Sequence, residues 1–207
     1  MARLESSFKN MLLTLLAVTF VSSACVGSVY ELTKGPLAET KRQRQIAAVR
    51  EVLPGFDNNP VEEKYQVPTD NGELIFYPAE KDGHSVGTAV ETFSDQGFGG
   101  RIRLMVGFLP EGAIHRITVL EHSETPGLGD KIDKKKSDFS QQFAGKDPAA
   151  FTLTVDKDGG DVDGITAATV SSRAFCDAVR RAVKALNQAD RDIKPIEVEI
   201  QMGTNSL

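Results

Sequence analysis

Cysteine and histidine are scarce in this chain, which has two cysteines and three histidines among 207 residues. Cys25 and Cys176 lie too far apart in the sequence to suggest a disulfide framework, and they lack the spacing of metal ligands. The histidines are isolated as well. The sequence therefore predicts no metal site.

An excess of positive charge is also absent. The chain has 24 lysines and arginines against 29 acidic residues, which gives a net charge of -5. A nucleic-acid-binding protein needs a basic face to neutralise phosphates, so we expect no nucleic-acid partner. No nucleotide-binding fingerprint, iron–sulfur cysteine cluster or acid–base dyad is present either.

The N-terminal region has one long uncharged run. No charged residue occurs between Asn10 and Tyr30, a length sufficient to cross a bilayer. We predict a transmembrane helix over 10–33, with 1–9 in the cytoplasm. A cleaved signal peptide is an alternative, because Ser22-Ser23-Ala24-Cys25 resembles a lipoprotein processing site, although Leu is missing three residues before Cys25.

A second helix is expected after the membrane. Gly35-Pro36 predicts a break in the first helix, and a stalk helix over 34–55 should follow and end at Pro54-Gly55. Its basic run, Lys41 to Arg50, is typical of a solvated face or a contact with membrane lipid headgroups.

Residues 56–207 predict a globular domain. Alternating apolar residues and the Lys81-Asp82-Gly83-His84 turn indicate an antiparallel sheet with one buried face. A short helix near Phe139 to Phe143 and a long helix from Val170 to Ala189 make the fold class α+β. The expected strands are Lys64–Val67, Leu74–Tyr77, Ser85–Phe93, Arg101–Phe108, Ile114–Glu121, Phe151–Val155 and Pro195–Ile200.

The entry to the long helix is the first candidate site. Small residues and a threonine, Thr169, lie where the first helical amides have no internal partner and the helix dipole is positive. A phosphate would be stabilised at this position. The pattern alone is more typical of an ordinary helix cap.

A second candidate site is the sequence Glu124-Thr125-Pro126-Gly127-Leu128-Gly129. An isolated segment of this kind is usually a tight turn.

Together the two segments resemble the FMN-binding domain shared by RnfG and NqrC, subunits of ion-translocating electron-transfer complexes. Asp163, Gly164, Thr166, Ala168 and Thr169 match the flavinylation motif Asp-Gly-x-Ser/Thr-Gly-Ala-Thr of that family. The resemblance implies that Thr169 carries FMN through a phosphoester bond. Ala167 occupies the position of the usual glycine, and its effect on flavinylation is left open.

The resemblance also assigns roles to the second segment, which packs on the bound flavin in this family. Amides of Gly127 and Gly129 and the hydroxyl of Thr125 would donate to the ring, and Leu128 would cover it. Glu124 would orient the loop instead. The cofactor-binding residues expected from the resemblance are Glu124, Thr125, Gly127, Leu128, Gly129, Asp163, Thr166, Ala168 and Val170.

The resemblance implies a single transmembrane helix followed by an antiparallel-sheet FMN-binding domain with flanking helices. The chain would relay electrons in an Rnf-type complex that couples electron flow between ferredoxin and NAD to Na⁺ or H⁺ transport. Other Rnf subunits and a flavin transferase would be its partners. The family places the FMN domain outside the cytoplasm, whereas the lysines and arginines at 34–44 would favour the opposite orientation.

Two alternatives remain at this point. One is an NqrC-like component of a Na⁺-translocating NADH:quinone reductase. The other is a membrane-anchored interaction module or lipoprotein without redox chemistry.

Overall fold

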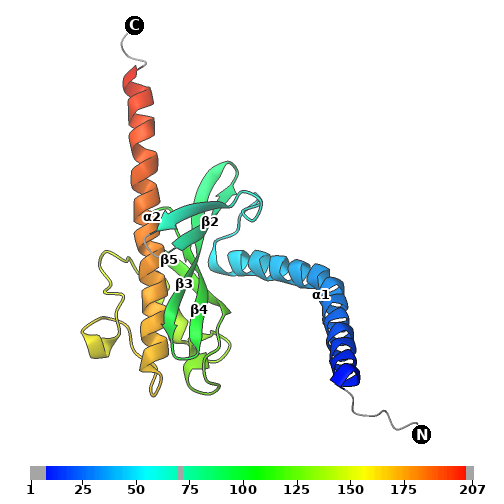
Figure 1. Cartoon of the computed structure of the whole chain (residues 1–207). Coiled ribbons are helices and arrows are strands. Elements are labelled where there is room, and N and C mark those ends of the chain that lie inside the picture. The colour runs from blue at the N-terminus through cyan, green and yellow to red at the C-terminus, as the bar shows by residue number, and fades with distance from the viewer. Residues whose placement is uncertain (1–7, 70–71, 204–207) are drawn as a thin grey trace. The chain divides into compact units, whose positions relative to one another are not determined.

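A computed structural model describes residues 8–69 and 72–203 of the chain, with side chains except at 36, 38 and 190–203. A long helix, α1 (Phe8–Val52), precedes a five-stranded sheet, and a second long helix, α2 (Thr169–Gly203), follows it (Figure 1). Contacts divide the chain into 1–44 and 45–207, so the last turns of α1 belong with the sheet. The predicted α+β class is confirmed.

The sheet is an antiparallel meander in which every strand pairs with its sequence neighbours. The five strands predicted before residue 122 are all present. Asp82 and Gly83 both have positive φ angles of 51° and 75°, which matches the type I′ turn that suits a tight hairpin. The strands are β1 (Tyr65–Thr69), β2 (Gly72–Lys81), β3 (His84–Gly97), β4 (Gly100–Phe108) and β5 (Ile114–Glu121).

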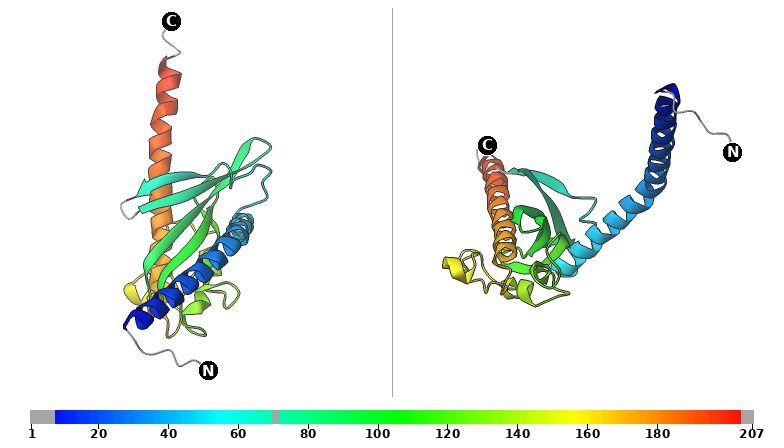
Figure 2. Two further views of the ribbon diagram at one scale, coloured as in Figure 1. Left: turned by 45° about the vertical axis from the view of Figure 1, so that its right-hand side comes forward. Right: turned by 60° about the horizontal axis from the view of Figure 1, so that its bottom comes forward.

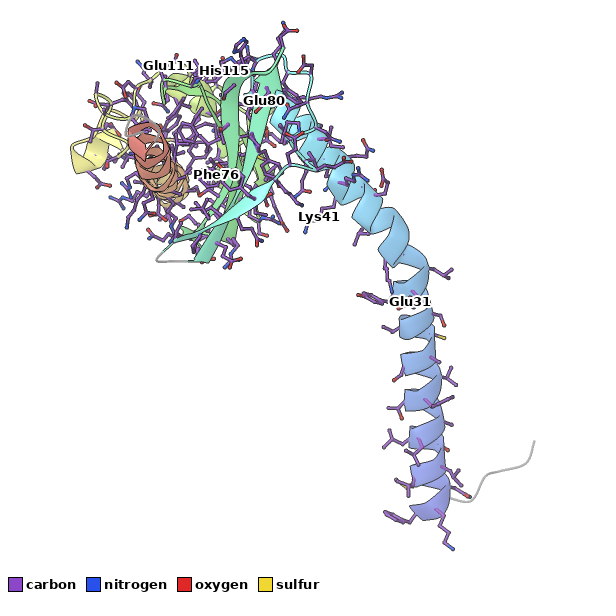
Figure 3. All side chains as sticks on the ribbon, turned by 90° about the horizontal axis from the view of Figure 1, so that it is seen from above. Glu31, Lys41, Phe76, Glu80, Glu111 and His115 are labelled. Carbon is purple, nitrogen blue, oxygen red and sulfur yellow. The ribbon has the colours of Figure 1, made fainter. Side chains whose placement is uncertain are left out.

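α2 covers one face of the sheet. Its buried side chains, including Phe175 and Val179, share a core with Phe76 and Leu104. Figure 3 shows the side chains that fill the space between α2 and the strands, where Phe76 lies. Two polar contacts tie α2 to β3, because Thr92 Oγ1 donates to Ala178 O at 2.9 Å and Ser94 Oγ donates to Asp177 Oδ2 at 2.7 Å.

The opposite face of the sheet is buried too, so the prediction of one buried face was wrong. Val49 and Val52 at the end of α1, and Leu53 directly after it, pack with Tyr77 and Met105. Successive strand residues point to opposite faces of the sheet. The buried residues on each of the two faces are mostly apolar here. Figure 2 shows α2 and the end of α1 on the two sides of the sheet.

The predicted helix break at Gly35-Pro36 was also wrong, because α1 is continuous from Phe8 to Val52. A proline removes one backbone donor, and α1 continues past that loss because the turns on both sides of Pro36 remain helical. The N-terminal part of α1 exposes its large apolar side chains and is long and apolar enough to cross a membrane. Residues 1–7 of the predicted cytoplasmic segment lie outside the described residues.

Two predicted strands are absent from the described residues. Phe151–Val155 forms only one bridge, between Val155 and Val162, and Pro195–Ile200 lies within α2. Phe151–Val155 runs instead as an irregular segment whose Thr152 and Thr154 carbonyls bond to Asp161 and Val162. Pro195–Ile200 extends a helix that has already formed, which is favoured because adding a turn to an existing helix costs less than nucleating a new element. The predicted helix at Phe139–Phe143 is present as the short 3-10 helix η2.

Candidate functional site

Thr169 is the first residue of α2 and follows a tight turn. Ala168 N donates to Ile165 O at 3.0 Å, which closes the turn around Thr166 and Ala167. Ala167 has a φ angle of 64° while Thr166 has no positive φ angle, as in a type II turn, whose third position takes glycine. This geometry is a physical reason for glycine at position 167 in the flavinylation motif.

Ser172 holds this turn against the helix. Its Oγ accepts a hydrogen bond from Ile165 N at 2.9 Å and donates to Ala168 O at 3.1 Å. Ser172 and Ile165 are buried, as is Ala168. Ser172 therefore fixes the turn on its buried side, and Thr169 remains partly exposed at the helix entry.

The Thr169 hydroxyl has a cationic neighbour. Lys157 Nζ donates to Thr169 Oγ1 at 3.3 Å. Lys157 belongs to the short 3-10 helix η3 (Asp156–Asp158), in the loop that precedes α2. A lysine ammonium and free helical amides together favour an anion at this position.

Glu124 brings the two sequence segments together. It is only 5% exposed, and its Oε2 accepts from Ser171 Oγ at 2.5 Å while its Oε1 accepts from Gly99 N at 3.0 Å. A Cβ atom on Gly129 would lie 2.5 Å from both Glu124 Oε2 and Ser171 Oγ. Glu124 thus joins the β3–β4 hairpin, its own loop and the first turn of α2.

Residues 125–128 of the loop are exposed, whereas Gly129 is buried. Leu128 N and Asp130 N both donate to Thr125 O, at 3.2 and 3.3 Å. Gly127 has a φ angle of 78°, and a Cβ there would have no heavy atom within 4 Å. Thr125, Gly127 and Leu128 therefore lie on the surface and are available to a ligand.

Three apolar side chains are exposed on the segments that Glu124 connects. Phe98, Leu128 and Val170 are 74%, 42% and 43% exposed. Phe98 is at the tip of the β3–β4 hairpin, next to the Gly99 amide that bonds to Glu124. In the described part of the globular domain, no other large apolar side chain is as exposed as these, and Tyr65 follows at 39%.

Asp163 and Thr166 are placed differently from Thr169. Both side chains are exposed, and the Asp163 backbone is held by Gln142, whose Oε1 accepts from Asp163 N at 2.8 Å and whose Nε2 donates to Asp163 O at 3.3 Å. Gly164 N donates to Asp156 Oδ1 at 3.2 Å. The backbone at the start of the motif is therefore held by side chains of residues that lie outside the motif.

The chain that carries this site is similar to a known domain family and to several known proteins. The FMN-binding domain family matches residues 97–184, a span that runs from the Phe98 hairpin through both segments into α2. A relative from Vibrio cholerae is 32% identical over 182 residues, which cover 84% of this chain and 87% of the relative. Both this relative and a second one, from Pasteurella multocida, are named as the G subunit (RnfG) of an ion-translocating oxidoreductase complex. The second is 36% identical over 193 residues, which cover 87% of this chain and 93% of the relative.

The chain belongs to the RnfG family. It contains an FMN-binding domain. A further RnfG protein, from Pseudomonas aeruginosa, is 34% identical over 192 residues, which cover 87% of this chain and 88% of the relative.

The site of this RnfG family member has groups that fit both ends of FMN. Thr169 and Lys157 would offer a hydroxyl and a cation to the phosphate, and the exposed side chains of Phe98, Leu128 and Val170 would offer apolar surface to the ring. No cluster of metal-ligating residues occurs in the part of the chain that the structure describes.

Five residues that shape this site were not predicted from the sequence. They come from separate segments, and only Ser171 and Ser172 lie in the helix that the sequence predicts from Val170 to Ala189, next to Thr169. Their hydroxyls in the first turn of a helix were the one available signal. The five residues are Phe98, Gln142, Lys157, Ser171 and Ser172.

Proposed function

We propose that this chain is an electron-transfer subunit that carries FMN covalently at Thr169 in a membrane complex of the Rnf type. The complex would couple electron flow between ferredoxin and NAD to Na⁺ or H⁺ transport. The Glu124–Ser171 hydrogen bond carries the proposal most strongly, because it joins the two flavin-associated segments at one site. The name of the relatives favours this complex over a quinone reductase.

The phosphate end of the cofactor would be held at the start of α2. Thr169 Oγ1 would form the new bond to phosphorus while an anhydride bond of a flavin dinucleotide breaks. A nucleoside monophosphate would leave, and the hydroxyl proton would pass to solvent. A flavin transferase is the partner that this step requires. The half-exposed hydroxyl supports the assignment, since a modifying enzyme can reach it.

The ring end would lie against the Glu124–Gly129 loop. Bound FMN supplies one- and two-electron redox chemistry. Amides of Gly127 and Gly129 and the Thr125 hydroxyl would donate to the ring oxygens, where negative charge grows on reduction. Leu128 and Val170 would limit the access of water, while Glu124 would hold the loop in place rather than contact the ring.

The attachment is tested by co-expressing the chain with a flavin transferase and measuring fluorescence in a denaturing gel. The wild type and Thr152→Ala, a control at an exposed threonine, should give a fluorescent band. Thr169→Ala should fold and give none. A fluorescent Thr169→Ala band, or a wild-type chain without one, would contradict the proposal.

The N-terminal part of α1 would anchor the chain in the inner membrane, with the FMN domain on the periplasmic side. Small residues, Ser22, Ser23, Ala24 and Gly27, would form a face for packing against other subunits or lipid. Cysteine introduced at exposed Lys135 tests the orientation. A membrane-impermeant maleimide should label Lys135→Cys in cells with a permeable outer membrane, and labelling only after lysis would reverse the orientation.

A further inference from the structure

Lys157 lies in a turn between two aspartates, of which Asp156 is bound to the flavinylation motif and Asp158 to α2. Asp156 Oδ1 accepts from Gly164 N at 3.2 Å. Asp158 accepts two hydrogen bonds from Arg173, each 2.7 Å long, and Arg173 is four residues after Thr169 in α2. The turn is thus attached on both sides of Lys157.

The backbone of the same loop is closed by its own hydrogen bonds. Asp156 N donates to Val162 O at 2.8 Å, and Gly160 N donates to Val155 O at 3.2 Å. Val155 and Val162 are fully buried in the core. A Cβ on Gly160 would lie 2.0 Å from Thr154 O, so the loop is closely packed there. The Cα of Lys157 is therefore held in a fixed place relative to Thr169.

The charge of Lys157 is not compensated within the loop. Arg173 occupies the Asp158 carboxylate, and its guanidinium lowers the pKa of Asp158. Asp156 is directed to a backbone amide instead. Within 8–69 and 72–189, Lys157 forms no ion pair, and its ammonium group contacts the Thr169 hydroxyl. A positive charge therefore lies beside this hydroxyl without an acidic partner.

We infer that Lys157 is a positioning residue that binds the phosphate group of the flavin on Thr169. This inference rests on the proposed function. A phosphodiester carries one negative charge on its two free oxygens, and an ammonium group within reach forms charge-assisted hydrogen bonds with them. Lys157 donates to the oxygen that becomes the ester oxygen, and small rotations of its side chain bring the free oxygens within reach.

The experiment compares Lys157→Met, Lys157→Arg and Lys135→Met with the wild-type full-length chain. Lys135 is an exposed lysine in the charge run 134–136, so Lys135→Met removes the same charge far from Thr169 in the sequence. The first measurement is the initial rate of covalent flavin incorporation with limiting flavin transferase and a flavin dinucleotide. The second is the phosphorus NMR shift of each fully flavinylated chain.

Lys157→Met should lower the initial rate about fivefold, because one exposed charge-assisted hydrogen bond is lost. Lys157→Arg should restore most of the rate. Salt at about 0.5 M should reduce the difference, since it screens exposed charges. The phosphorus resonance should shift in Lys157→Met and stay unchanged in Lys135→Met.

Equal rates in Lys157→Met and Lys135→Met would overturn the inference. A slower rate with an unchanged phosphorus resonance would also overturn it, because Lys157 would then act on the transferase and not on the phosphate. In either case flavin is still incorporated at Thr169. A wild-type chain that takes up no covalent flavin would instead overturn the proposed function.

Discussion

Ser171 Oγ lies 2.5 Å from Glu124 Oε2, although the two residues are 47 positions apart in the sequence. The contact is buried, and the other carboxylate oxygen of Glu124 accepts from Gly99 N. One carboxylate therefore sets the position of a loop, a hairpin tip and the first turn of a helix. Each of these three segments carries one of the exposed apolar side chains Phe98, Leu128 and Val170.

Glu124→Ala should destabilise the domain by about 2–4 kcal/mol, because the buried Ser171 hydroxyl and the Gly99 amide both lose their acceptor. Ser171→Ala should cost about 1–2 kcal/mol, since Gly99 keeps its partner. In a double-mutant cycle the two changes should be coupled by about 1 kcal/mol or more. Urea unfolding of the detergent-solubilised chain measures these energies.

Ser123→Ala is the control for that cycle. Ser123 is exposed and adjacent to Glu124, and its loss should change the free energy of unfolding by less than about 0.5 kcal/mol. Additive effects of Glu124→Ala and Ser171→Ala would show that the hydrogen bond does not connect the two segments in solution.

The two glycines of the loop should respond differently to alanine. Gly127→Ala is limited by a φ angle of 78° and should cost about 1–2 kcal/mol. Gly129→Ala should cost about 3 kcal/mol, because its Cβ would displace both Glu124 and Ser171. Thermal or urea unfolding distinguishes the two. In a Glu124→Ala background the cost of Gly129→Ala should fall, and an unchanged cost would place the clash elsewhere.

Ala167→Gly should stabilise the domain. The φ angle of 64° at Ala167 strains an L-residue, and relief of that strain exceeds the entropy cost of glycine by about 0.5–1 kcal/mol. Ala144→Gly is the matched control, because Ala144 is exposed with a φ angle of -64° and should lose stability. If both substitutions changed the free energy of unfolding in the same direction, the strain at Ala167 would be contradicted. A change in flavinylation rate in Ala167→Gly would show whether the turn also affects the transferase.

Phe98→Ser should leave the stability of the flavin-free chain within about 0.5 kcal/mol of wild type, since the side chain is 74% exposed. In the flavinylated chain it should increase quenching of flavin fluorescence by iodide, because an apolar cover is removed from the ring. Phe143→Ser, at a fully buried position, should instead unfold the domain. Unchanged quenching in Phe98→Ser would place Phe98 away from the ring.

Cys176 should be unreactive in the folded domain. Burial raises the pKa of its thiol to about 12, so the reactive thiolate is almost absent near neutral pH. In a Cys25→Ser chain, a thiol reagent at pH 8 should label Cys176 only after denaturation.

The same shift gives a dependence of stability on pH. Because the folded pKa lies above the unfolded value of 9.0, the contribution to stability is complete below pH 9 and is lost as the pH rises towards 12. Cys176→Ala should make that alkaline decline shallower. Rapid labelling of the native chain at pH 8 would contradict the burial.

The elements of this fold follow largely from short-range patterns. Alternating apolar residues predicted the five strands, and Asp82-Gly83 predicted the turn between β2 and β3, because side-chain period and turn geometry depend on neighbours in the sequence. The predictions that failed were the helix break at Pro36, the single buried face of the sheet, and the strands at Phe151–Val155 and Pro195–Ile200. A strand exists only when a partner is in reach, which local sequence does not determine.

The sequence by itself determined the five paired strands, the start of the long helix after them, the apolar segment near the N-terminus and the two segments that suggest a flavin, because each depends on residues close together in the chain. Only the tertiary structure decided that Glu124 meets Ser171, that Lys157 meets Thr169 and that the end of α1 covers the second face of the sheet. These contacts join residues far apart in the sequence. They depend on how the sheet and α2 pack, and no local periodicity encodes that packing.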